Sequence, residues 1–239
     1  MRTVTEGVIK MSESTKERSA ALSRNSCEAK ERSAALSRNS CEAKERSAAL
    51  SRKTRETDIE VKLTLGRSEE VTPDTGIGFF DHMLELLARH GGLSLTVQAK
   101  GDLRVDGHHT VEDIGIVIGK ALAEALGDKK GIRRYGYAVI PMDEALATCA
   151  LDISGRPFIV FDAKYASDRV GDFDTELAQE FFRALAFAAG LTLHLRCDYG
   201  GNDHHKIEAM FKAFARALKE ASSIDPDAAN EIPSTKGVL

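Results

Sequence analysis

A five-residue motif of two histidines followed by a glutamate occurs twice in this sequence, and its spacing suits a metal site. The copies are HHTVE at 108–112 and HHKIE at 204–208. On a helix, a glutamate four residues after the first histidine and three after the second projects from the same face. Each copy therefore presents imidazole nitrogens and a carboxylate oxygen together, which are donors that divalent transition metals bind.

Aligning the two parts of the sequence that carry the motif adds two more candidate ligands. When His82 is placed opposite Glu180, GLSL at 92–95 pairs with GLTL at 190–193, and a two-residue gap then superposes the histidine pairs. Five of the seven histidines fall at these positions. We predict a mixed imidazole and carboxylate site, which leaves manganese, iron and zinc open. The predicted ligands are His82, His108, His109, Glu112, Glu180, His204, His205 and Glu208.

Two half-domains of the same order position these residues. Alternating apolar and polar residues predict strands, and apolar residues at helical spacing predict helices, several of which end at glycine. The strands are expected at 57–65, 93–99, around 150–160 and at 191–196, and the helices at 79–90, 108–126, 177–189 and 204–221. The segment TPDTG at 72–76 is expected to form a turn. We predict an α+β fold of two duplicated half-domains, 54–147 and 148–224, each a sheet covered by helices on one face, with a C-terminal tail at 225–239.

The first part of the chain is repetitive. The segment KERSAALSRNSCEA at 16–29 recurs without change at 30–43, and a truncated copy occupies 44–52. Each unit has too few large apolar residues to offset the entropy of ordering the chain. We therefore expect residues 1–53 to be a disordered or partly helical extension, with the functional domain beginning near Thr54.

The composition of the chain limits the classes of ligand and partner that are expected. With 42% hydrophobic and 29% charged residues the chain is globular, and a net charge of −4 gives no reason to expect nucleic acid or an anionic membrane. The sequence has no apolar run long enough to span a bilayer and no secretory signal near its start, so a cytoplasmic protein acting on a small molecule is expected. The four cysteines show no paired spacing and are expected to be reduced and without a metal role.

Several residues suit an anionic substrate. Arg134, Arg156 and Lys212 lie near turns or one turn beyond the second motif, and PSTKG at 233–237 has the hydroxyls, lysine and glycine of a phosphate cradle. For proton transfer, the candidates are Glu56, at the start of the first strand, and the motif glutamates.

Seven ordered segments resemble the imidazoleglycerol-phosphate dehydratase family over about Arg55 to Leu239. They are FFDHML (79–84), DGHHTVED (106–113), GDKKGIRRYG (127–136), PMDEALA (141–147), DISGRP (152–157), NDHHKIEAMFKAFARAL (202–218) and PSTKG (233–237). The repeated N-terminal segment lies outside the resemblance and looks like an extension peculiar to this chain.

The resemblance implies half-domains of βαββα type, like the second domain of ribosomal protein S5. It implies a symmetric homo-oligomeric shell of about 24 subunits with manganese at the interfaces, two ions per active site. The reaction implied is dehydration of D-erythro-imidazole glycerol 3-phosphate to imidazole acetol phosphate, in histidine biosynthesis. Carried over residue by residue, it implies proton transfer by Glu56 or Glu208, and substrate contacts from Glu56, His82, Arg134, Arg156, Lys212, Ser234 and Lys236. Many members of the family have histidine where this chain has Glu180, so the role of that residue is the least secure.

Two other functions are compatible with parts of the pattern. A metal-storage shell would use the His/Glu helices without a substrate, but Arg134, Arg156 and PSTKG argue against it. A metal-dependent hydrolase is the other alternative. No D-x-D-x-T element occurs, because Asp172-Phe173-Asp174-Thr175 has the wrong spacing, so we predict no phosphatase activity.

Overall fold

A computed structural model describes residues 45–66, 69–237 and 239 of the chain. The repeat copies at 16–29 and 30–43 lie outside the described residues, and with them most of the predicted N-terminal extension. The residues from Glu45 onward form one compact unit.

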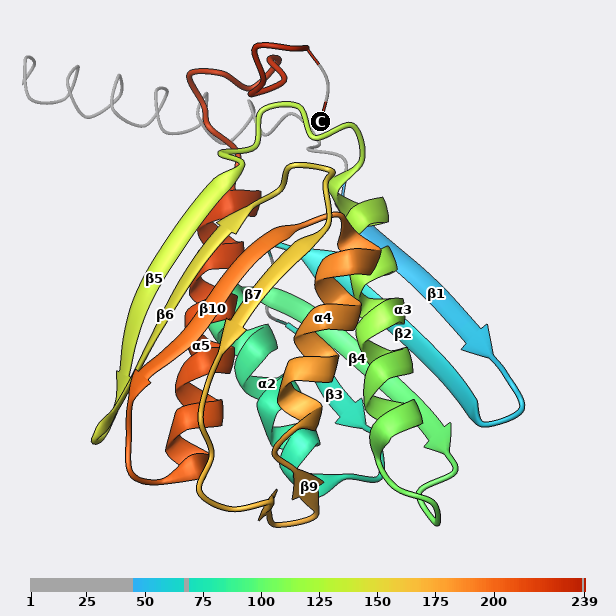
Figure 1. Ribbon diagram of the computed structural model, residues 1–239. Helices are drawn as coiled ribbons and strands as arrows, with labels where there is room; N and C mark the ends of the chain where they lie inside the picture. Colours follow the sequence, from blue (N-terminus) through green and yellow to red (C-terminus); the bar gives the residue numbers. More distant parts are fainter. Residues whose placement is uncertain (1–44, 67–68, 238) are drawn as a thin grey trace, which may run out of the picture. The chain divides into compact units, whose positions relative to one another are not determined.

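The first half of this unit is a four-stranded sheet with two helices (Figure 1). Its elements are β1 (Ser47–Lys53), β2 (Thr57–Leu65), β3 (Val71–Asp74), α2 (Gly78–Gly91), β4 (Leu93–Gly101) and α3 (His108–Leu126). In β2, Ile59, Val61 and Leu63 are buried and alternate with the exposed Glu60 and Lys62, as in a strand with one face on the core. The sheet order is β1-β2-β4-β3, with β3 parallel to β4 and the other pairs antiparallel.

The second half repeats this topology. Its main elements are β5 (Tyr135–Met142), β6 (Ala145–Asp152), β7 (Phe158–Asp162), α4 (Leu177–Ala189), β10 (Thr192–Tyr199) and α5 (Asp203–Ser222). The sheet order is β5-β6-β10-β7, with β7 parallel to β10 and the other pairs antiparallel. The predicted α+β class with two duplicated halves is confirmed, and each half contains strands that the sequence patterns did not predict.

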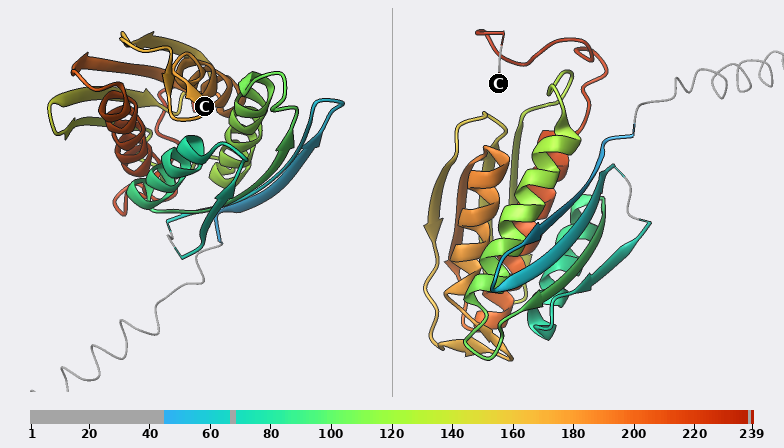
Figure 2. Two further views of the ribbon diagram at one scale, coloured as in Figure 1. Left: turned by 90° about the horizontal axis from the view of Figure 1, so that it is seen from below. Right: turned by 90° about the vertical axis from the view of Figure 1, so that its right-hand side faces the viewer.

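The four helices form a layer between the two sheets (Figure 2). Within each half the helices cover the inner face of their own sheet, and across the layer α3 packs against α4 and α2 against α5. A Cβ added to Gly115 would lie 2.8 Å from the carbonyl oxygen of Phe181, and one on Gly119 would lie 2.6 Å from that of Leu185. These two glycines allow α3 to approach the backbone of α4 closely, which joins the halves.

The structure moves two predicted boundaries. β1 lies within the range 1–53 that was expected to be an extension, so the fold begins before Thr54. The third repeat copy can form β1 because an edge strand needs few apolar side chains, and here Ala48 is buried and Leu50 packs against the core. The predicted division between residues 147 and 148 falls inside β6, whereas the two sheets separate between α3 and β5.

The segment predicted as a turn at 72–76 is also partly strand. β3 pairs with β4 through Val71 to Asp74 and lies at the edge of its sheet, where a proline such as Pro73 is tolerated because no second neighbour needs its missing amide.

The halves differ in how their third strand leads into the next helix. In the first half, residues 75–77 connect β3 to α2. In the second half, residues 163–176 connect β7 to α4 and contain a small hairpin of β8 (Arg169–Val170) and β9 (Phe173–Asp174). We call residues 163–176 the bracket loop.

Among the described residues, no helix has the length and apolar character needed to cross a membrane. Cys149 and Cys197 are free thiols, and burial raises the pKa of Cys149. Cys27 and Cys41 lie outside the described residues.

Candidate active site

Three predicted ligands meet between α2 and α5. Oε2 of Glu208 lies 3.2 Å from Nε2 of His204 and 3.9 Å from Nε2 of His82, and the ligand atoms all lie within 4.8 Å of one another. Two ligands each about 2.1 Å from one metal ion are at most about 4.2 Å apart, so both distances from Glu208 suit a shared ion. We call His82, His204 and Glu208 the α2/α5 cluster.

Glu208 is the electrostatic centre of this cluster. Its side chain is only 8% exposed, and its Oε1 forms an ion pair with Nζ of Lys212 at 2.6 Å. Burial alone would raise the pKa of Glu208, but the hydrogen bond from Lys212 and the charges of Lys212 and His82 hold it below its usual value. The carboxylate is therefore ionised at neutral pH and ready to bind a cation.

The first motif lies next to Glu180 in a second cluster between α3 and α4. NH2 of Arg183 lies 3.2 Å from Oε1 of Glu112 and 2.5 Å from Oε2 of Glu180, so one guanidinium joins both carboxylates. His108 stands four residues before Glu112, on the same face of α3. We call His108, Glu112 and Glu180, with Arg183, the α3/α4 cluster. The sequence alignment placed all eight predicted ligands in one set. In the structure, six of them lie in these two separate clusters.

The second histidine of each motif turns to other carboxylates. His109 Nδ1 lies 3.0 Å from Asp102 and 3.9 Å from Glu56. His205 Nδ1 lies 2.7 Å from Glu144. These hydrogen bonds raise the pKa of both histidines, and the bond with His205 lowers that of Glu144 to about 2. Within the described chain, neither ring is part of the α2/α5 cluster.

The predicted phosphate-binding residues lie elsewhere, apart from Lys212. Arg134 binds Asp152 through two hydrogen bonds of 2.7 and 3.1 Å, and its NH1 donates to the carbonyl of Pro233 at 2.8 Å. Arg134 thereby ties down the tail that carries Ser234 and Lys236. The Arg156 side chain is 69% exposed and approaches Asp152 at 3.9 Å.

This group of residues is far from the α2/α5 cluster. The backbone amide of Arg134 donates to the carbonyl of Ala221, near the end of α5, while His204 lies in its first turn. The helix between His204 and Ala221 spans about 25 Å. In Figure 1 the helices begin at the lower end of the molecule, and the C-terminal tail lies at the upper end.

Sequence reasoning missed several residues that hold the ligands. Arg183 stands three residues after Glu180, a helical ion-pair spacing that could have been noticed. Asp102 and Glu144 come from turns that approach the histidines only in the folded chain, so no local pattern indicated them.

The duplicated α+β fold defines a protein built from two copies of one half-domain, and its α2/α5 cluster could hold a metal ion. The imidazoleglycerol-phosphate dehydratase family model matches residues 75–218. A curated relative of that name from Clostridium botulinum is 58% identical over 187 residues, covering 78% of this chain and 95% of the relative. One from Listeria welshimeri is 58% identical over 186 residues, with the same coverage.

Solved structures of proteins from the same family are similar to this chain. The imidazoleglycerol-phosphate dehydratase of Staphylococcus aureus has a TM-score of 0.69 and 46% identity, covering 75% of this chain and 99% of that one. The enzyme from Pyrococcus furiosus has a TM-score of 0.69 and 36% identity, covering 80% of this chain and all of that one. The chain belongs to the imidazoleglycerol-phosphate dehydratase family.

Proposed function

We propose that the chain catalyses the metal-dependent dehydration of D-erythro-imidazole glycerol 3-phosphate to imidazole acetol phosphate, as a hydro-lyase of histidine biosynthesis. Its membership of the family supports the reaction. The observation that carries the metal dependence is the α2/α5 cluster, in which two imidazoles surround an ionised, buried carboxylate. The expected cytoplasmic location stays a prediction.

The proposed metal is manganese, held at two positions. His82, His204 and Glu208 would hold one ion, and His108, Glu112 and Glu180 the other. Imidazole and carboxylate donors without a thiolate are compatible with manganese, iron or zinc, and the resemblance to the dehydratase family favours manganese. When bound, the metal supplies Lewis-acid stabilisation of charge that develops on the substrate.

Proton transfer is assigned to Glu56. Both oxygens of Glu208 are engaged, Oε1 by Lys212 and Oε2 by the histidines, which suits a ligand better than a proton carrier. The Glu56 side chain is 56% exposed and lies beside His109 at the start of β2, so it can reach a bound substrate. A carboxylate in that position can take a proton from carbon and return one to the leaving hydroxyl.

The phosphate is assigned to Arg156, Ser234 and Lys236, with Arg134 positioning the tail and Lys212 near the metal. Arg156 offers an exposed guanidinium, which binds phosphate through paired hydrogen bonds. Ser234 and Lys236 lie in a turn in which the hydroxyl of Ser234 accepts from the amide of Lys236.

The separation of these groups supports a homo-oligomer. A substrate made of an imidazole ring, a three-carbon chain and a phosphate is on the order of 10 Å long, by ordinary bond lengths. It cannot bridge the roughly 25 Å along α5 between the cluster and Arg134. We propose that active sites form between copies of the chain, in the implied shell of about 24 subunits. His109 and His205, which turn away from the α2/α5 cluster, would complete metal sites there.

The test is an assay of the purified full chain with imidazole glycerol phosphate, before and after chelation and again with Mn²⁺ restored. We expect dehydration that chelation abolishes and Mn²⁺ recovers. An absence of metal-dependent dehydration would refute the proposal. Tight Mn²⁺ binding without turnover would instead favour a storage shell.

A further inference from the structure

The first turn of α2 is capped by a residue from the other half of the chain. Ile77 precedes the helix and offers no side-chain cap. Instead, the carboxylate of Asp172, 94 residues away from Gly78, accepts hydrogen bonds from the amides of Gly78 at 2.6 Å and Phe79 at 3.1 Å. These amides belong to the turn immediately before His82. The bracket loop therefore fixes the end of α2 that presents a metal ligand.

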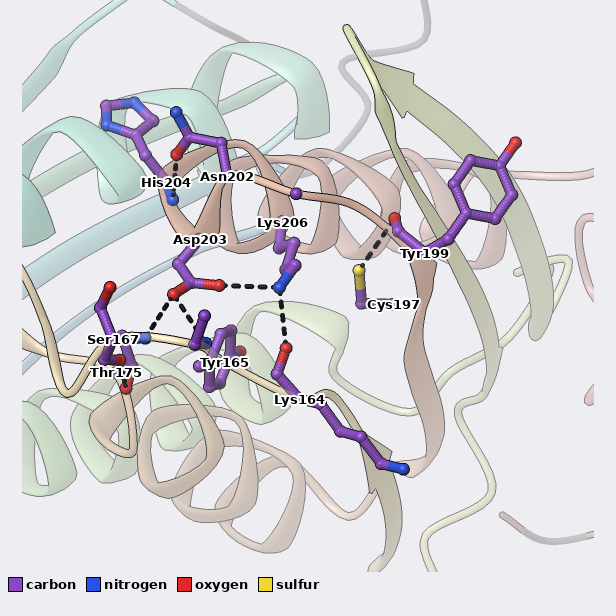
Figure 3. A network of polar contacts seen from close by, with 12 residues as sticks. Lys164, Tyr165, Ser167, Thr175, Cys197, Tyr199, Asn202, Asp203, His204 and Lys206 are labelled. Atoms are coloured by element: carbon purple, nitrogen blue, oxygen red, sulfur yellow. Dashed lines mark hydrogen bonds and ion pairs between the residues drawn. The ribbon is translucent and has the colours of Figure 1, made fainter.

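The same loop is fixed to the first turn of α5 at its other end. Oδ2 of Asp203 accepts from the amides of Ala166 at 2.9 Å and Ser167 at 2.8 Å. Oδ1 lies 2.8 Å from Nζ of Lys206, which also donates to the carbonyl of Lys164 at 2.9 Å. Figure 3 shows these contacts converging on Asp203, the residue before His204 in the chain. Asp203 and Lys206 are both buried, so the contacts are shielded from water.

The two anchor points are joined by a tightly folded loop. The amide of Thr175 donates to the carbonyl of Asp168 at 2.9 Å, and β8 pairs with β9. Phe173, fully buried, packs on Phe79 with a centroid distance of 5.4 Å. Phe79 in turn packs edge-on against His204 at 5.0 Å. The first turns of α2 and α5 are thus connected both by the hydrogen bonds of the bracket loop and by the ring contact of Phe79 with His204.

We propose that the bracket loop fixes the first turns of α2 and α5 relative to each other, and that Asp172 is a positioning residue for the α2/α5 cluster. The loop acts on His82 through the cap of α2 and on His204 and Glu208 through Asp203. The first half has only residues 75–77 at the equivalent connection, so the α3/α4 cluster has no corresponding bracket in the described chain. This proposal rests on the proposed role of the α2/α5 cluster in binding metal.

The test compares Mn²⁺ binding by the full wild-type chain and by single-residue variants, measured by calorimetry and by the electron paramagnetic resonance signal of free Mn²⁺. Asp172→Ala removes the cap. Asp172→Asn keeps an oxygen that can accept the amide hydrogens. Asp174→Ala is the matched control, since it removes a carboxylate of the same loop that pairs with Arg169 and caps no helix. Glu208→Gln identifies which binding step belongs to the α2/α5 cluster.

We expect Asp172→Ala to weaken that step about three- to tenfold, the effect of losing a helix cap, and to leave the other step unchanged. Asp172→Asn should recover most of the affinity, Asp174→Ala should match the wild type, and saturating Mn²⁺ should restore kcat in Asp172→Ala. Asp172→Glu keeps the charge and disturbs only the geometry, so it carries the test if the alanine variant does not fold.

Unchanged binding in both Asp172→Ala and Asp172→Glu, or equal weakening by Asp174→Ala, would overturn the proposal. Failure of the proposed function can be distinguished from failure of this proposal, because the wild type itself would then show no dehydration or no Glu208-dependent binding step.

Discussion

The α2/α5 and α3/α4 clusters are related by the duplication, since each takes one helix from each half, yet different residues hold them. Glu208 is paired with Lys212, one turn further along α5, whereas Glu112 is paired with Arg183 from the neighbouring helix. The position in α3 that corresponds to Lys212 is Ile116. The motif is therefore shared, while the cation that balances its glutamate comes from a different element in each half.

The clusters also differ in how far they are preorganised. In the α2/α5 cluster, the three ligand atoms lie within 4.8 Å of one another, close to the spacing that one ion requires. In the α3/α4 cluster, a guanidinium occupies the space between the two carboxylates. A metal entering there has to displace Arg183, whereas at the other cluster the nitrogens and the oxygen already converge.

The largest expected effect comes from substituting the motif glutamate of each cluster and comparing the losses of activity. Glu208→Gln should lower kcat/KM by at least about 10²-fold, more than the loss of a group that only supports a ligand, because it removes a charged ligand and leaves Lys212 without its counter-charge. Glu112→Gln should cost less, since Glu180 can still pair with the exposed Arg183. Steady-state kinetics and metal content at matched Mn²⁺ would check both, and equal losses would show that the clusters do not differ in this way.

The second prediction concerns the contact that joins the halves. Gly115→Ala should destabilise the fold by about 1–3 kcal/mol, because the new Cβ would crowd the carbonyl of Phe181 at the crossing of α3 and α4. Thermal unfolding with and without Mn²⁺ would measure it. Lys120→Ala, at an exposed position of the same helix, is the control and should change little. An unaltered melting temperature in Gly115→Ala would mean that the helices can move apart freely.

A smaller effect tests whether Arg183 competes with metal. Arg183→Gln should tighten Mn²⁺ binding at the α3/α4 cluster by up to about fivefold, since exposed ion pairs contribute at most about 1 kcal/mol. Calorimetric titration would detect the change, and Arg169→Gln, which breaks an exposed pair in the bracket loop, is the control. Weaker binding would instead make Arg183 a support of the site. A Glu180→Ala variant with unchanged metal content would remove Glu180 from the ligand set.

The smallest expected effect is a shift in pH dependence. A hydrogen bond to Glu144 raises the pKa of His205, so this histidine keeps its proton to a higher pH than usual and a metal must compete with that proton. Mn²⁺ binding should therefore weaken as pH falls through the raised pKa of His205. Glu144→Gln should move that loss to lower pH. Titrations of Mn²⁺ at a series of pH values would show it, with Asp58→Asn, in the other half, as a control.

The sequence predicted the regular elements well where the pattern was strong. The helices at 108–126 and 177–189 were predicted with their observed bounds, because apolar periodicity ran up to a terminal glycine in each case. β1 and β3 were missed because edge strands need little apolar surface and so lack a clear alternating pattern.

The ligands could be proposed from the duplicated motif, but their division into two clusters could not. Which helices pair across the layer depends on close packing at residues such as Gly115, whose contact in α4, the carbonyl of Phe181, belongs to the other half of the chain. The cap that Asp172 gives to α2 joins residues of different halves, and no local pattern encodes it. Arg134 was predicted to contact phosphate, and only the fold shows that it also holds the tail.

The origin of β1 in a repeated sequence has a consequence for the length of the chain. The segment SAALSR begins β1 at 47–52 and also occurs at 19–24 and 33–38. β1 has a single partner, β2, and the entropy of closing a loop grows with its length, so the copy nearest β2 is favoured for this position. Gain or loss of an upstream unit leaves the same edge-strand sequence beside β2. The repeat array can therefore gain or lose whole units without changing the sequence of β1 or its pairing with β2.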